Sequence, residues 1–219
     1  MRKKIKMLVS NNYWMYKFAR LTDAIIHSRG LKIKTWGGVK LDVFNLGKNN
    51  RFIAGRDCLF DKVSVRIRGN NNTITFENNV KMGKHCEILI NGNNCQIYVG
   101  ENCTFTSFNA LEVNEDNQKI KIGENCMFSN HIHIRTGDSH AIYDLQTHLR
   151  INPARSVSIG SDVWIAAGVT ILKGVEIGSG SVVGKGSIVT HNIPNNVIAV
   201  GIPAKVVKSG ICWSKELGV

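Results

Sequence analysis

The most regular pattern in the chain is a hydrophobic residue at every sixth position near the C-terminal end. Aliphatic side chains recur at Ile159, Ile165, Ile171, Ile177, Val183 and Val189. A small or β-branched residue stands four positions after each of the first five, at Val163, Val169, Val175, Ser181 and Ser187. This spacing fits neither an amphipathic helix nor a half-buried strand, whose periods are about 3.6 and 2. It predicts a chain that turns a corner once per hexad and points one aliphatic side chain inward on each face.

Three hexads would close one triangular coil, so the pattern predicts stacked coils that bury one another's interior. Weaker copies of the same motif occur earlier, at 80–88, 97–105 and 120–128, and resemble VSIGSDVWI at 157–165. We interpret the spacing from Gly83 to Gly100 as one coil, and the wider spacing to Gly123 as a coil with a longer corner. Asn-Gly and Asn-Asn clusters are typical of such corners.

The best repeat is interrupted by the segment RTGDSHAIYDLQTHLRINPARS at about 135–156. These residues exceed what a coil can hold, so we expect an extruded loop. Long loops on rigid scaffolds are where functional residues concentrate. The sequence therefore directs the search for a site to this loop.

The two ends of the chain differ from the repeat. Residues 1–34 carry Trp14, Phe18, Leu21 and Ile25 at helical spacing on a basic background, which predicts a short N-terminal helix. Docking against the open end of the repeat is the favoured interpretation, and contact with anionic lipid is the alternative. The repeat then occupies 35–193. A tail follows at 194–219, where prolines end the hexad rhythm.

Composition narrows the possible partners. The 219 residues carry a formal net charge of +12, and 43% are hydrophobic, enough for a real core. A basic protein attracts anions, including phosphorylated small molecules, but no nucleic-acid-binding motif accompanies the charge. No segment reaches the ~18 apolar residues of a membrane helix, and the start lacks the apolar part of a secretory signal. We therefore expect a cytoplasmic protein without a nucleic-acid partner.

Four of the six cysteines recur in a Gly-x-x-Cys pattern, at Cys58, Cys86, Cys103 and Cys126. No CxxC pair is present, which disfavours zinc binding. Cysteine is a small buried hydrophobe in reduced proteins. We predict that these four occupy the inward position that Val163 holds later in the chain.

The repeat, the TGDSHAIYD loop, the VWIAAGVTILKGVEIG coil and the GIPAKVVK tail together resemble the hexapeptide-repeat acyltransferases. Within that family the sugar and polysaccharide O-acetyltransferases are the most similar, and the resemblance is strongest from Gly123 to Lys208. It implies an all-β fold, a left-handed parallel β-helix. It also implies acetyl-CoA as acyl donor and a homotrimer with active sites between subunits.

By this resemblance His140, in the extruded loop, matches the catalytic histidine of the family. A neutral imidazole can accept the proton of a sugar hydroxyl, and such general-base help is worth about 10² to 10⁴ in rate. Asp138 or Asp144 could orient the ring, and the sequence does not choose between them. Trp164 should point outward and flank the cleft, where it would help to place the acceptor or the histidine.

The resemblance also assigns positions to the donor and the acceptor. It places Ala167 and Lys185 beside the pantetheine arm, with the Ala167 N–H as an oxyanion donor. Thr190, His191, Lys205 and Lys208 match positions near the nucleotide end, where lysines suit phosphate. Lys185 and His191 depart from the usual family residues. Asn109 is the candidate for holding the acceptor sugar.

Three other functions share some of these sequence features. An N-acetyltransferase of amino sugars would share the donor and the base, but such enzymes usually add a nucleotide-binding unit with a Gly-rich βαβ signature. A metal enzyme like the γ-class carbonic anhydrases would use histidines such as His131, His133 and His140. The coil after the loop lacks the histidine that class carries, so we expect no metal. A non-catalytic scaffold is the third alternative, disfavoured by the loop.

Overall fold

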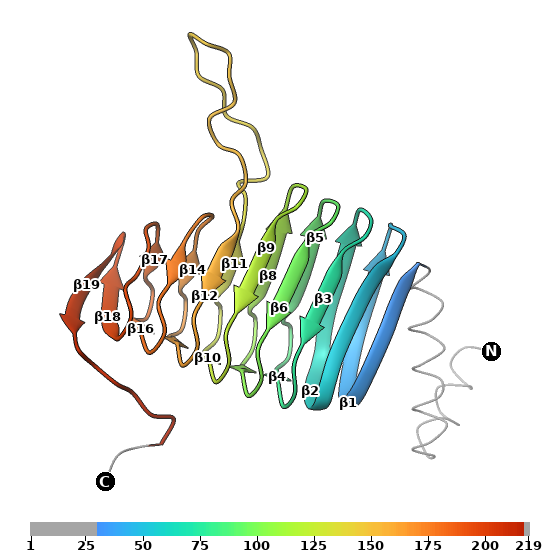
Figure 1. Ribbon diagram of the computed structural model, residues 1–219, viewed down its shortest axis with the longest axis horizontal. Coiled ribbons are helices and arrows are strands. Elements are labelled where there is room, and N and C mark those ends of the chain that lie inside the picture. Colours follow the sequence, from blue (N-terminus) through green and yellow to red (C-terminus); the bar gives the residue numbers. More distant parts are fainter. Residues whose placement is uncertain (1–29, 217–219) are drawn as a thin grey trace.

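The structure, a computed structural model, describes residues 30–216 of the chain, and these residues form strands, turns and loops without a helix (Figure 1). The predicted N-terminal helix falls almost entirely outside them. Strand β1 already begins at Leu31, so the solenoid starts before the predicted boundary at residue 35. No helix long and apolar enough to cross a membrane occurs among the described residues.

The strands lie edge to edge in one continuous 19-stranded sheet that winds around a triangular core. Their bounds are β1 Leu31–Asn45, β2 Asn50–Arg68, β3 Thr73–Phe76, β4 Lys81–Met82, β5 Glu87–Asn91, β6 Gln96–Val99, β7 Thr104–Phe105, β8 Ala110–Asn114, β9 Lys119–Ile122, β10 Met127–Phe128, β11 His133–Arg135, β12 Val157–Ile159, β13 Trp164–Ile165, β14 Thr170–Ile171, β15 Glu176–Ile177, β16 Val182–Val183, β17 Ile188–Val189, β18 Val197–Gly201 and β19 Ala204–Ser209.

Strands inside the solenoid pair in parallel with a strand one coil earlier and a strand one coil later, as β12 does with β9 and β15. The architecture is the predicted left-handed parallel β-helix. It continues past the predicted end at residue 193, because β18 still pairs in parallel with β16. The exception to the parallel order is the closing hairpin, in which β19 runs antiparallel to β18.

The hexad residues line the core as predicted. Ile165, Ile171 and Val189 are 0% exposed, and so are the intervening Val163 and Ser181. Cys58, Cys103 and Cys126 lie in the same inward column as Val163, because their neighbours pair across successive coils. Cys86 is equally buried but lies in the next column, where Asn109 and Ile132 follow it in successive coils. The prediction of one shared position therefore holds for three of the four cysteines.

Coil length changes along the solenoid. In the earlier coils stacked residues are 23 positions apart, as in the bond from Asn79 to Asn102, whereas Ser161 and Ser179 are 18 apart. The interpretation of Gly83 and Gly100 as one coil apart is wrong. Gly83 N bonds Phe105 O and Gly100 N bonds Ile122 O, which places the two glycines at different corners. The extra residues form asparagine-rich corners that the hexad pattern does not contain.

Asparagine stabilises these corners in a backbone conformation that few residues tolerate. Asn79, Asn102 and Asn125 occupy equivalent corner positions with φ of 57°, 59° and 59°. Asparagine accepts the left-handed region more readily than other non-glycine residues. Their side-chain amides also bond one another from coil to coil, at 2.9 and 3.2 Å.

Candidate acyl-transfer site

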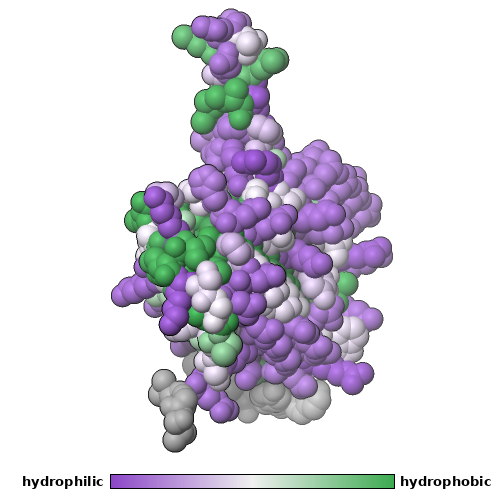
Figure 2. Space-filling view, turned by 60° about the vertical axis from the view of Figure 1, so that its left-hand side comes forward, coloured by the Kyte–Doolittle hydropathy of each residue, from purple (hydrophilic) through white to green (hydrophobic). Residues whose placement is uncertain are grey.

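The interrupting segment leaves the solenoid at the corner between β11 and β12 and projects far from it as a long arm (Figure 1). Its outer part exposes large apolar side chains, which appear as green patches at the tip in Figure 2. Ile142, Tyr143, Leu145, Leu149 and Ile151 are 53% to 87% exposed. A loop of this composition is unusual on a free surface, because exposed apolar patches generally mark contacts with a partner.

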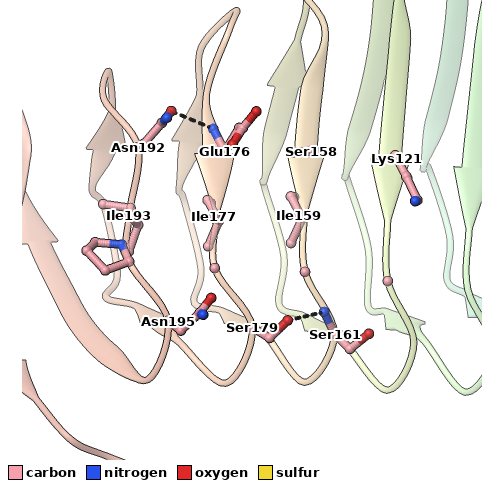
Figure 3. Close-up of a pocket in the computed structure, with 14 residues that line it drawn as sticks. Lys121, Ser158, Ile159, Ser161, Glu176, Ile177, Ser179, Asn192, Ile193 and Asn195 are labelled. Carbon is pink, nitrogen blue, oxygen red and sulfur yellow. Dashed lines mark hydrogen bonds between the residues drawn. The ribbon is translucent and has the colours of Figure 1, made fainter.

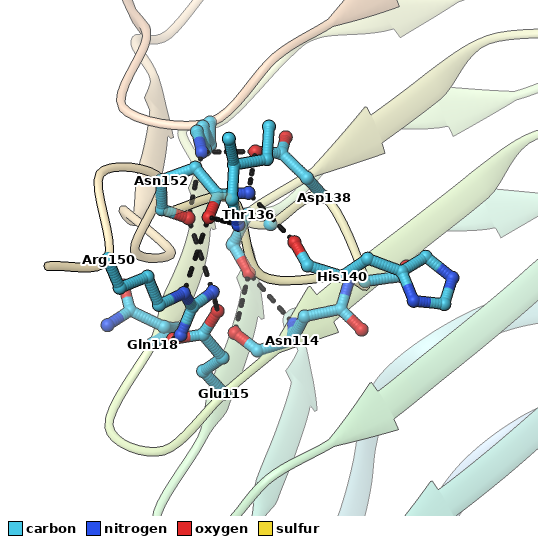
Figure 4. A network of polar contacts seen from close by, with 12 residues as sticks. Asn114, Glu115, Gln118, Thr136, Asp138, His140, Arg150 and Asn152 are labelled. Carbon is cyan, nitrogen blue, oxygen red and sulfur yellow. Dashed lines mark hydrogen bonds and ion pairs between the residues drawn. The ribbon is translucent and has the colours of Figure 1, made fainter. Parts of the chain in front are cut away.

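The root of the arm is held by one buried amide. Asn152, 7% exposed, donates from Nδ2 to Asp138 Oδ2 at 2.9 Å and to the backbone oxygen of His140 at 2.8 Å. Its Oδ1 accepts from the N–H of Ile142 at 2.6 Å. One side chain therefore links both strands of the arm and sets the backbone that carries His140 (Figure 4).

Two ion pairs tie the same root to the coils. Lys173 pairs with Asp138 and donates to the backbone oxygen of Asn152 at 3.1 Å. Arg150 pairs with Glu115, with one N–H to oxygen distance of 3.0 Å. Both contacts lower the pKa of the carboxyl they engage. The arm is thus anchored to the coil before it and to the coil after it.

Neither candidate aspartate orients the imidazole of His140. Asp138 is engaged by Lys173 and Asn152. Asp144 accepts from Gln146 N and from the N–H and hydroxyl of Thr147, which caps a turn of the arm and lowers the pKa of Asp144. The His140 ring is exposed, points away from Asp138 and Asn152, and bonds no group among residues 30–216 (Figure 4). Within the single chain, therefore, neither aspartate makes the predicted contact with the His140 ring.

A polar cluster that the sequence analysis missed lies on the coils beside the arm. Glu112, whose side chain is 12% exposed, bonds His133 Nε2 at 2.8 Å and contacts Arg135 at 3.5 Å. The bond from His133 is the main cause that lowers the pKa of Glu112 to about 2. Arg135 also donates to Gly137 O at 2.8 Å and to Ser139 Oγ at 3.1 Å. This cluster reaches the residue next to His140.

Trp164 lies on β13, on the face opposite the corner between β11 and β12 from which the arm leaves. Its side chain points outward as predicted, with 36% exposure. The neighbouring strands on that face, β10 and β16, run along the lower edge of Figure 1, whereas the arm projects from the upper edge. His140 and Trp164 therefore lie on separate parts of one protomer. The structure does not bring them together within a single chain.

The residues predicted for the donor gather at the C-terminal end of the solenoid. Ala167 and Lys185 occupy the same corner in successive coils, since Gly186 N bonds Ala167 O at 2.9 Å. The N–H of Ala167 bonds no group in the described part of the chain. Lys185, Lys205 and Lys208 are exposed, and Thr190 Oγ1 lies 2.7 Å from His191 Nδ1.

Bare backbone runs along this corner. A side chain at Gly186 would meet nothing within 4 Å, and one at Gly168 would meet only Gly186. The corner thus offers an open edge with an unpaired amide, flanked by exposed lysines. That arrangement fits a thin ligand with a phosphorylated end, so the predicted donor residues suit coenzyme A.

Asn109 does not fit the predicted acceptor role. Its side chain is buried, with 2% exposure, and its Oδ1 accepts from the N–H of Ile132 at 2.9 Å. The side chain lies in the inward column of Cys86 and Ile132, at the regular hexad position four residues after the buried Phe105. The N–H groups of its amide bond nothing in the described chain.

A hollow of about 560 Å³ lies on the face of β9, β12 and β15 (Figure 3). Lys121, Ser158, Glu176 and Asn192 line it along successive coils. It contains none of the residues predicted for donor, acceptor or catalysis. We therefore place no chemistry in it.

Two of the three histidines considered for a metal site, His131 and His133, have other partners. His131 stacks on Phe108 with ring centroids 4.9 Å apart, and His133 bonds Glu112. Among residues 30–216 no group of three or more His, Cys, Asp or Glu side chains is arranged to hold a metal ion.

Comparison with known proteins agrees with the fold. Residues 156–191 match the bacterial transferase hexapeptide family (six repeats). The crystal structure of the polySia-specific acetyltransferase NeuO superposes with a TM-score of 0.75 and 32% identity, covering 86% of this chain and 90% of that one. The polysialic acid O-acetyltransferase OatWY superposes with a TM-score of 0.71 and 27% identity, covering 86% and 92%.

A curated relative matches over a shorter stretch. The polysialic acid O-acetyltransferase of Escherichia coli O1:K1 / APEC is 45% identical over 82 residues, which is 37% of this chain and 27% of that protein. The chain thus spans about a quarter of the length of that relative. The β-helix, its hexads and the interrupting arm define a hexapeptide-repeat transferase. The chain belongs to the hexapeptide-repeat acyltransferase family.

Proposed function

We propose that this protein transfers an acetyl group from acetyl-CoA to a hydroxyl of a sugar or surface polysaccharide, with His140 as general base. The observation that carries the proposal is an exposed imidazole at the root of an arm whose backbone Asn152 holds in place. The names of NeuO, OatWY and the E. coli relative add support for a polysaccharide acceptor.

Each of the proposed site residues has its own role in the acetyl transfer. Bound acetyl-CoA would supply an acetyl thioester along the bare corner of Gly168 and Gly186. His140 would take the proton of the acceptor hydroxyl as its oxygen attacks the carbonyl carbon, and would return that proton to the departing thiol sulfur. The unpaired N–H of Ala167 suits the carbonyl oxygen, where negative charge develops. Lys205 and Lys208 would pair with the phosphates.

The site is completed by a second copy of the chain, and we propose a homotrimer. His140 and Trp164 lie apart within one protomer, and the arm exposes apolar side chains that need a cover. An arm that packs on the neighbouring solenoid would cover these apolar side chains and would bring His140 of one chain close to Trp164 of the next. Mixing a His140→Ala chain with a Trp164→Ala chain tests this directly. Activity should return on co-assembly, whereas independent protomers would stay inactive.

The activity itself is tested by acetyl-CoA turnover over a panel of neutral and acidic sugars, oligosaccharides and polysaccharides. The expected product is an ester, which alkali cleaves. An alkali-stable amide would show an amino-sugar N-acetyltransferase instead. Absence of transfer to every acceptor, with no thermal stabilisation by coenzyme A, would overturn the proposal, because a ligand that binds only the folded state must stabilise it.

A further inference from the structure

The C-terminal residues 211–216 form a strap that returns along the solenoid, and its Trp213 ring packs against Trp164. After β19 the chain turns back past the lower edge of the coils (Figure 1). Ile211 N bonds Asn196 O at 3.0 Å, Trp213 Nε1 bonds Asp162 O at 2.6 Å, and Lys215 Nζ bonds Asn102 O at 3.1 Å. Every second residue of the strap therefore reaches a corner of the solenoid.

The three acceptors share one structural position. Asn196, Asp162 and Asn102 all have a left-handed backbone, with φ of 55°, 56° and 59°. They belong to one column of corner residues, in which Asn196 N bonds Ser179 O and Asp162 N bonds Glu124 O. Because this column repeats from coil to coil, it offers a regular ladder of carbonyl oxygens. The strap is thus in register with the solenoid.

The contacts of the strap place the ring of Trp213 beside that of Trp164. The rings of Trp213 and Trp164 lie with centroids 5.9 Å apart at 45°. The Trp213 indole is also held by its bond to Asp162 O, two residues before Trp164 in the chain. A ring fixed at both its face and its N–H restricts the rotamers open to its neighbour, because aromatic pairs prefer defined relative orientations.

We propose that Trp213 is a positioning residue, which holds the Trp164 indole in the orientation that acyl transfer requires. This inference rests on the proposed function, since it needs Trp164 at the reaction site. Trp213 touches Trp164 and the backbone of Asp162 rather than the reacting atoms. A displacement of Trp164 would lower the rate, because small misplacements near reacting groups cost up to about 10²-fold.

Two variants separate positioning from folding. Trp213→Phe keeps a ring and loses the N–H, whereas Trp213→Ala loses both. We expect Trp213→Ala to lower kcat/KM for the acceptor by about tenfold to 10²-fold, with the melting temperature and coenzyme A affinity unchanged. Trp213→Phe should recover most of the rate. Lys215→Ala, which removes a strap contact but no ring, is the matched control and should keep full activity.

A readout independent of catalysis uses Trp164 as reporter. With Trp14 and Trp36 changed to Phe, either Trp213 variant leaves Trp164 as the remaining tryptophan. We expect acrylamide to quench Trp164 more strongly in Trp213→Ala than in Trp213→Phe. Equal quenching would overturn the contact itself, even if the protein is inactive. Greater quenching with unchanged kcat/KM in an active enzyme would overturn the positioning role and leave the proposed function standing.

Discussion

The Nε2 atom of His133 lies 2.8 Å from Oε2 of Glu112, across the step between strands β8 and β11. The same carboxylate accepts from Asn114 Nδ2 at 2.9 Å and contacts Arg135. Arg135 also donates a hydrogen bond to the hydroxyl of Ser139, the residue before His140. Glu112 therefore joins the face of the solenoid to the root of the arm.

Replacing Glu112 should change the acid stability of the protein. Its carboxyl pKa falls from 4.5 to about 2 on folding, so its contribution is fully present above pH 4.5 and is lost as the pH falls toward about 2. We expect Glu112→Gln to lower the unfolding free energy at neutral pH by about 1 to 3 kcal/mol and to flatten its decline below pH 4.5. Urea unfolding at several pH values measures both. The exposed Glu176→Gln serves as control, and an unchanged acid slope in Glu112→Gln would contradict the account.

Removing the amide of Asn152 should loosen the arm while the coils stay folded. Asn152→Ala loses the bonds to Asp138, His140 and Ile142, which leaves those groups unpaired. We expect faster tryptic cleavage at Arg150 and a kcat lowered by about 10²-fold, with the unfolding transition of the solenoid retained. Asn195→Ala, on an exposed corner, is the matched change. Unaltered proteolysis of the arm would argue against its being clamped by Asn152.

Shortening a core side chain tests whether the inward hexad residues stabilise the solenoid more than the outward ones. Ile171 is fully buried on β14, and Ile188, one coil later, is half-buried and points outward. Ile171→Ala should cost about 2–5 kcal/mol of unfolding free energy. Ile188→Ala should cost clearly less, because its side chain does not fill the core. If denaturant titrations showed the same loss of unfolding free energy for both variants, the assignment of Ile171 to the core and Ile188 to the outer face would be contradicted.

Binding of coenzyme A should depend on the C-terminal lysines. Both Lys205 and Lys208 are exposed on β19, where removal of the charge leaves the fold intact. We expect the Lys205→Ala, Lys208→Ala double variant to melt like the wild type without ligand. With coenzyme A it should gain a smaller rise in melting temperature. The difference should shrink as salt increases, since the phosphate contacts are screened. A full ligand-induced rise in the double variant would remove the lysines from the site.

The hexad pattern alone was enough to predict the coil, the core columns and the place where the arm leaves. Whether a residue such as Val163 faces inward depends only on its phase within the repeat. Contacts between coils are different, because they depend on coil length. Lys173 meets Asp138 across 35 positions, and Trp213 meets Asp162 across 51. The arm sets the first separation and the returning C-terminal residues set the second, and a period of six encodes neither.

The acceptor role of Asn109 was implied by the resemblance rather than by the hexad phase. Its side chain faces inward because it stands four positions after the buried Phe105, as Val169 stands after Ile165. Within the single chain neither Asp138 nor Asp144 contacts the imidazole of His140, and the orienting role stays a prediction. Both carboxylates lie near His140 in the sequence, but Lys173 and Thr147 occupy them.

The most direct test of the account is the acceptor kcat/KM of a His140→Ala protein, measured beside His148→Ala. His148 is the other histidine of the arm and is also exposed, so the pair separates chemistry from general disturbance of the arm. General-base catalysis predicts that His140→Ala loses about 10² to 10⁴ in rate, with stabilisation by coenzyme A unchanged, while His148→Ala stays active. A His140→Ala protein with full transferase activity would contradict it.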